Sequence, residues 1–166
     1  MEKPTGKTVS RVEARLQELG LALPEPLVLP SPNRTSGVRV KNMLYLSGHG
    51  AALLEDESVM RRGKLGAEVS QEEGYRTARA LALKMMATIK HLVGDLDRIE
   101  KVVKIVGMIN AVPEFETHNK VLDGASDLFY EVFGPDIGCH GRSSVGVGGL
   151  VANQPVEIEG IFQIRD

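Results

Sequence analysis

The chain has 166 residues, enough for one compact domain and too few for two of ordinary size. Hydrophobic residues make up 42% and charged residues 25%, a balance typical of a soluble globular protein and not of a disordered chain or a membrane protein. The net charge of -2 supplies no general field for drawing in phosphate backbones, so nucleic acid is not an expected partner.

Cysteine usage and the start of the chain predict a cytoplasmic location. The single cysteine, Cys139, cannot form an internal disulfide, which fits a reducing compartment. The opening MEKPTGKT lacks the apolar stretch of a secretory signal. No segment approaches the roughly 20 apolar residues that a membrane span needs, so no membrane association is expected.

We expect residues 1–36 to form an accessory segment ahead of a main domain at 37–166. Ser10 and Glu13 have capping-box spacing and predict a short helix that ends at Gly20. The next stretch, LPEPLVLPSPNRTSG, has four prolines in 15 residues and predicts an irregular crossing over the body of the protein.

A hairpin and a long helix are predicted next. Residues 38–40 and 43–47 have the pattern of two short strands around a turn at Lys41 and Asn42. The helix covers 70–93, starting with the capping box Ser-Gln-Glu-Glu and ending at Gly94. Its apolar residues step by three and four and form one stripe for packing on a sheet: Tyr75, Ala78, Ala82, Met85, Ile89 and Leu92.

The second half of the chain predicts a strand, a helix and two more strands. IEKVVKIVGMINAV is strongly β-branched and predicts a strand, and Pro113 fits the first turn of a helix that ends at Gly134-Pro135. Residues 143–149 and 156–164 are predicted strands joined by a turn at VANQP. This order predicts an α+β domain with two helices on one face of a mixed sheet.

No predicted element covers the second face of that sheet, so this face must contact water, a ligand or another subunit. In the last predicted strand, Glu157 and Glu159 alternate with an apolar set and must point away from it.

Four segments occur in an order that points to a known family: MLYLSGHG, GDLDRIEKVVKIVGMI, PEFETHNKV and GRSSVGVGGLVANQPVEIEGI. They resemble the YjgF/Rid family of reactive intermediate deaminases, over about residues 37–164. The resemblance implies a chorismate-mutase-like α+β fold that assembles as a homotrimer, with the sheets facing inward and clefts at the subunit interfaces. It also implies hydrolysis of enamine or imine acids such as 2-aminoacrylate to a 2-keto acid and ammonia, without metal or organic cofactor.

The resemblance also implies a small set of site residues. Arg142 would bind the substrate carboxylate with two parallel donors, provided that its own chain leaves it without an acidic partner. Glu157 would orient a water and relay its proton, an effect worth about 10²- to 10⁴-fold in rate. Four further residues are expected to bind substrate or line the cleft: Ser47, Asn119, Ser144 and Cys139.

Structural readings of these residues stay open. Arg142 could pair with Glu157 or Glu159, across a hairpin of the last two strands or between subunits. Ser47 and Asn119 could serve only to hydrogen-bond the backbone. A single cysteine beside a histidine, with no further ligand at metal spacing, does not predict a metal site.

The chain departs from the commonest members of the family. Ser144 stands where they carry a cysteine, and the stretch between Asn119 and Arg142 is longer, with DGAS inside it. In these features the chain resembles a divergent YjgF-like branch whose members are often named as endoribonucleases or translation inhibitors.

Three functions therefore follow from the sequence. The first is a cofactor-independent deaminase of the 2-iminobutanoate/2-iminopropanoate type, and the second is a non-enzymatic trimer that binds small carboxylic or 2-keto acids. The third, cleavage of RNA or inhibition of translation, ranks last because an acidic chain with 4% aromatic residues offers little for stacking or phosphate binding.

Overall fold

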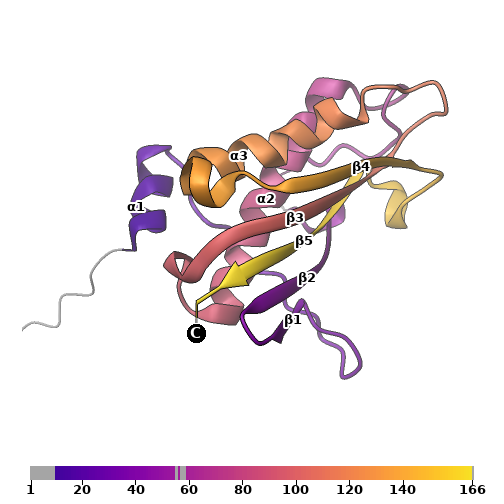
Figure 1. Cartoon of the computed structure of the whole chain (residues 1–166). Coiled ribbons are helices and arrows are strands. Elements are labelled where there is room, and N and C mark those ends of the chain that lie inside the picture. The colour runs from indigo at the N-terminus through magenta and orange to yellow at the C-terminus, as the bar shows by residue number, and fades with distance from the viewer. Residues whose placement is uncertain (1–9, 55, 57–58, 166) are drawn as a thin grey trace, which may run out of the picture.

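A computed structural model of the chain describes residues 10–54, 56 and 59–165. One five-stranded mixed sheet, in the order β1-β2-β5-β3-β4, carries α2 and α3 on one face (Figure 1). This confirms the predicted α+β class and the two helices on one face. The strands are β1 (Gly37–Val40), β2 (Met43–Gly50), β3 (Ile99–Asn110), β4 (Gly141–Val147) and β5 (Val156–Ile164). The helices are α1 (Arg11–Glu18), α2 (Gln71–Val93) and α3 (His118–Gly138), with 3₁₀ turns η1 (Ala51–Leu53), η2 (Leu96–Arg98) and η3 (Val151–Asn153).

The pairing of the strands confirms one predicted hairpin and corrects another. β1 and β2 pair antiparallel around Lys41, whose φ of 54° lies in the left-handed region that a tight hairpin turn requires. β4 pairs with β3 in parallel, and β5 pairs with β2 and β3 antiparallel. The expected hairpin of the last two strands is therefore wrong. Helix α3 returns the chain to the end of the sheet at which β3 began, so β4 takes the edge beside β3 and β5 enters the gap on the other side.

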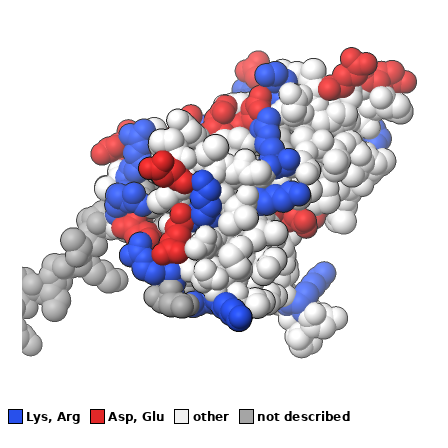
Figure 2. All heavy atoms as spheres, viewed as in Figure 1, with Lys and Arg blue, Asp and Glu red and all other residues white. Residues whose placement is uncertain are grey.

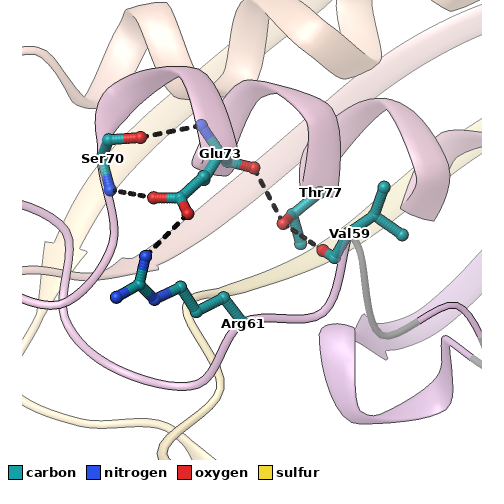
Figure 3. Close-up of polar contacts among 5 residues, drawn as sticks. All are labelled: Val59, Arg61, Ser70, Glu73 and Thr77. Carbon is teal, nitrogen blue, oxygen red and sulfur yellow. Dashed lines mark hydrogen bonds and ion pairs between the residues drawn. The ribbon is translucent and has the colours of Figure 1, made fainter.

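Helix α2 begins and ends where the sequence predicts. The Ser70 hydroxyl accepts a hydrogen bond from the Glu73 N–H at 3.2 Å, and the Glu73 carboxylate accepts one from the Ser70 N–H at 2.8 Å (Figure 3). The Ser70 N–H, followed by the guanidinium of Arg61, lowers the pKa of Glu73 to about 2. At the other end, Gly94 has a φ of 88° and donates its N–H to the Lys90 carbonyl.

The core lies between the sheet and the two helices. Of the predicted stripe on α2, Ala78, Ala82, Met85 and Ile89 are fully buried, whereas Leu92 is exposed. Gly124 lets α3 approach α2 closely, because a Cβ at that position would clash with the backbone carbonyl of Tyr75.

Helix α3 begins later than the sequence predicts. Pro113 lies in a turn before His118, because the segment at Leu65 pairs with the end of β3: the Leu65 N–H donates to the Asn110 carbonyl, and the Val112 N–H donates to the Leu65 carbonyl. Gly134 interrupts the helix at the predicted place with a φ of 77°, and one more helical turn follows.

Helix α1 is joined to the body of the protein by a carboxylate. Asp97 accepts hydrogen bonds from the backbone N–H groups of Arg11 and Val12 at 2.8 and 2.9 Å, which satisfies donors that a helix start leaves unpaired. Val12 and Leu16 are buried in the same core cluster as the sheet residues. Within the described residues, no helix combines the length and the hydropathy that crossing a bilayer requires.

Candidate functional site

Arg142 lies on the edge strand β4 and points toward α3. Its register partner on β3 is Ile105, which is fully buried under the helices, so both side chains leave the sheet on the helix face. Its Nη2 donates to the Asp123 carboxylate at 2.7 Å and its Nη1 donates to the Ser126 hydroxyl at 3.0 Å. The expectation that this guanidinium has no acidic partner within the chain is therefore wrong. Two of its five N–H donors are used by these contacts, and its side chain is 29% exposed.

A half-buried histidine, His140, contacts the Ser126 hydroxyl that binds Arg142. His140 Nδ1 lies 2.6 Å from the Gly138 carbonyl, which can only accept, so Nδ1 carries the proton of the neutral ring. Its Nε2, 3.1 Å from the Ser126 hydroxyl, then accepts that hydroxyl's proton and leaves the oxygen to accept from Arg142. Burial lowers the pKa of His140, and the charges of Arg142 and Lys101 act in the same direction.

The Arg142 side chain lines a cavity of about 300 Å³ on the α3 side of β4. Cys139 is exposed and lines this cavity. Asp127, which accepts a hydrogen bond from the Tyr75 hydroxyl, is a second acid in the lining. The cavity thus presents one cation and two acids, a pattern that suits a small ligand carrying both a carboxylate and a cationic nitrogen. Its lining residues are Asp123, Ser126, Asp127, Tyr130, Gly138, Cys139, His140 and Arg142.

Glu157 lies on the opposite face of the sheet. It alternates with Val156 and Ile158, both fully buried under the helices, so its side chain points to the open face. Its carboxylate accepts a hydrogen bond from Gln154 Nε2 at 3.0 Å and lies against Gly48, where a Cβ would clash with it. Gln154 is itself buried, and its side-chain oxygen Oε1 accepts a hydrogen bond from the Ala52 N–H at 2.9 Å.

The three remaining predicted residues lie apart. Ser47 stands at an irregularity in the pairing of β2 with β5 and donates its hydroxyl proton to the Thr35 carbonyl at 2.7 Å. Ser144 has a buried hydroxyl oxygen that lacks a hydrogen-bond partner among the described residues. Asn119 is exposed in the first turn of α3.

The predicted residues therefore form two groups within one chain. Arg142 and Cys139 share the cavity beside α3, whereas Glu157 lies against Gly48 of β2 on the other face. Sequence reasoning missed Asp123, Ser126 and Gln154, which hold the two charged side chains. Among the residues that the structure describes, no group of three or more His, Cys, Asp or Glu side chains could hold a metal ion.

Comparison with known proteins shows which family the chain belongs to. Residues 13–153 match the model of the family described as "YjgF/chorismate_mutase-like, putative endoribonuclease". The chain belongs to this family. The predicted recognition of a divergent YjgF/Rid member and the chorismate-mutase-like fold are thereby confirmed.

Three similar proteins cover nearly the whole chain. "Protein TCP17" of Trypanosoma cruzi is 36% identical over 156 residues, which are 94% of this chain and 96% of that protein. A protein of unknown function from Agrobacterium tumefaciens is 35% identical, with a TM-score of 0.81 over 93% of this chain and 94% of its own. A structure titled as a putative endoribonuclease from Shewanella oneidensis is 31% identical, with a TM-score of 0.84 over 92% and 99%.

Proposed function

We propose that this protein is a cofactor-independent deaminase that hydrolyses small 2-imino or enamine acids to 2-keto acids and ammonia. The observation that carries the proposal is the Arg142 cavity, in which a guanidinium with unused donors lies beside Asp123. A 2-imino acid carries a carboxylate for Arg142 and, when protonated, a positive nitrogen for the acid.

The two halves of the site come from different subunits in this proposal, as in a homotrimer. Arg142 and Glu157 leave opposite faces of one sheet, so a single chain cannot bring them to one substrate. The open face that carries Glu157 also bears exposed apolar side chains that suit burial against a neighbouring subunit. The strand pairing puts four exposed apolar side chains on the same face as Glu157: Val38, Val40, Tyr45 and Val145.

The proposed reaction needs only one group that binds the carboxylate and one that transfers protons. Arg142 binds the carboxylate, and Glu157 takes a proton from a water as its oxygen adds to the imine carbon. The resulting carbinolamine holds the former imine nitrogen as an amine. Glu157 returns the proton to this nitrogen, and the C–N bond then breaks with its electron pair leaving on ammonia. Glu157 takes the hydroxyl proton as the C=O bond forms, the 2-keto acid leaves, and the proton departs with the ammonia as ammonium. Gln154 positions the carboxylate for both steps through the hydrogen bond to Glu157.

The test is ammonia release from freshly generated 2-iminopropanoate, compared with the uncatalysed rate. We expect the wild type to accelerate release, and Arg142→Ala and Glu157→Gln to lose about 10²-fold or more of that acceleration. A wild-type rate equal to the uncatalysed rate overturns the proposal. Arg142-dependent binding of a 2-keto acid without turnover would instead identify a non-enzymatic binder.

The surface gives little support to an RNA-cleaving function. On the face shown in Figure 2, lysine and arginine side chains are interspersed with aspartate and glutamate. Together with the net charge of -2, this offers no broad basic field for a phosphate backbone on that face.

A further inference from the structure

Asn110, the last residue of β3, connects the end of its strand to two segments that are distant in the sequence. It is fully buried, and its side-chain Nδ2 donates hydrogen bonds to the Asn153 side-chain oxygen at 3.0 Å and to the Gln154 carbonyl at 3.2 Å. Its Oδ1 accepts a hydrogen bond from the Lys64 ammonium at 2.6 Å. We propose that Asn110 is a positioning residue that holds Gln154 and, through Gln154, the carboxylate of Glu157. This inference rests on the proposed function, in which Glu157 transfers the protons.

The charge of Lys64 determines how the Asn110 amide is oriented. An ammonium can only donate, so the atom next to Lys64 Nζ is the amide oxygen, and the amide nitrogen faces the connection between β4 and β5, residues 148–155. The same ammonium donates to the Gly148 carbonyl at 2.8 Å, at the start of this connection. Lys64 and Asn110 therefore hold the connection at both of its ends.

The connection contains two consecutive residues in a backbone conformation that L-amino acids rarely adopt. Ala152 and Asn153 have φ values of 55° and 53°, in the left-handed region. Such a conformation costs free energy at an alanine and persists only where the surrounding contacts impose it. The Asn153 carbonyl accepts a hydrogen bond from the Gly63 N–H at 2.8 Å, and its side chain is held by Asn110. Without the Asn110 donors, we expect the connection to relax and to move Gln154, which follows directly.

Gln154 links the connection to the carboxylate. Its side chain lies between the Ala52 N–H, which donates to Oε1 at 2.9 Å, and Glu157, which accepts from Nε2 at 3.0 Å. Space around the amide is limited, because a Cβ at Gly50 would clash with it. A shift of the Gln154 backbone must therefore move the Glu157 carboxylate or break its hydrogen bond.

The test removes the donors of Asn110 and keeps the rest of the side chain. Asn110→Asp has the same shape and keeps an oxygen for Lys64, but its carboxylate has no N–H to donate to the connection. In the ammonia assay with 2-iminopropanoate, we expect kcat to fall by about tenfold or more, because the proton-transfer group is misplaced. KM should change by less than about twofold, because Arg142 still binds the substrate carboxylate.

A double-mutant cycle distinguishes positioning from a general loss of stability. Gln154→Met keeps the length of the side chain and removes the amide that binds Glu157. If Asn110 acts through Gln154, Asn110→Asp should lower kcat no further in the Gln154→Met background. Equal fold losses of kcat in both backgrounds overturn the proposal, as does an unchanged kcat in the folded Asn110→Asp protein. Leu16→Ala, which truncates a buried side chain of α1, is the control and should lower stability without changing kcat.

Asn153→Gly replaces Asn110→Asp in this cycle if the latter does not fold. Glycine adopts a φ of 53° without strain at this exposed position, and the substitution removes one of the two acceptors of Asn110. We expect a smaller loss of kcat in the wild-type background and none in the Gln154→Met background. An unchanged kcat in the wild-type background overturns the proposal.

Crystal structures of the wild type and Asn110→Asp separate a failure of this inference from a failure of the proposed function. The 3.0 Å contact between Gln154 Nε2 and Glu157 should be present in the wild type and lost in the variant. If the wild type has no turnover, the proposed function is wrong, but loss of this contact still assigns the placement of Glu157 to Asn110. A contact that persists in the variant overturns the role of Asn110, whether or not the wild type is active.

Discussion

Asp123 partly neutralises the positive charge of Arg142, which should affect any ligand that binds there. The two side chains form a 2.7 Å ion pair at an edge of the sheet that is only partly exposed, where screening by water is incomplete. The acid holds the guanidinium in one orientation and also repels any anion that approaches it. A ligand with both charges benefits from the pair, whereas a simple anion gains less from it.

Asp123→Asn should therefore separate these two kinds of ligand. The amide keeps a hydrogen-bond acceptor for Arg142 but removes the negative charge. We expect binding of pyruvate, a simple anion, to tighten by about tenfold, while turnover of 2-iminopropanoate falls. Calorimetry and the ammonia assay measure the two effects. If pyruvate affinity does not change, Asp123 has no electrostatic role at the site.

His49 should make the stability of the protein depend on pH. Burial, followed by the nearby charge of Lys84, lowers its pKa to about 4 against the opposing hydrogen bond to Ser47, whereas in the unfolded chain it titrates near 6.5. The unfolded state therefore binds the proton first. The contribution of His49 is fully present above 6.5 and is lost as the pH falls from 6.5 toward 4.

Lowering the pH from 7 to 5 should thus remove about 2 kcal/mol of unfolding free energy through this one group. Urea denaturation at the two pH values measures the loss. His49→Gln lacks the titrating ring, so its stability should change less between the same pH values. An identical pH dependence in the two proteins would show that another group is responsible.

At the scale of elements, the contact between α2 and α3 depends on the missing side chain of Gly124. Gly124→Ala improves helix propensity by about 1 kcal/mol, but its Cβ clashes with the Tyr75 carbonyl, a backbone atom that cannot rotate away. We expect a net destabilisation of about 1–3 kcal/mol, measured by urea denaturation. Gly148→Ala is the matched control, because no atom lies within 4 Å of its new Cβ, and it should change stability little. A Gly124→Ala protein as stable as the wild type would show that the helices can separate without cost.

Elements with a local signal were predictable, and those fixed by distant contacts were not. The capping box at Ser70 and the turn at Lys41 depend only on residues adjacent in the sequence, and both occur as predicted. The start of α3 depends on pairing with Leu65, some 50 residues away, and local sequence favoured Pro113 instead. Gln154 is close to Glu157 in the sequence, but its orientation depends on a distant contact, because its side-chain oxygen accepts a hydrogen bond from the Ala52 N–H.

At the scale of the whole molecule, the proposal that the site is shared between subunits can be tested by mixing two inactive variants. Arg142→Ala keeps Glu157, and Glu157→Gln keeps Arg142. In a cyclic trimer, each mixed assembly contains one interface with both native residues, so co-refolding equal amounts should restore about a quarter of the wild-type activity. The ammonia assay measures it. No recovery, with mixed assemblies confirmed by mass spectrometry, would show that Arg142 and Glu157 do not form a shared site between subunits.

The strand order also has a consequence for synthesis on the ribosome. β5 follows every other strand in the sequence, yet it lies in the middle of the sheet, between β2 and β3. Until that strand leaves the exit tunnel, the β1-β2 hairpin and the β3-β4 pair have no common neighbour and remain two separate units with unpaired edges. Nascent chains paused before residue 156 should therefore be open to proteases and chaperones, however long translation waits there.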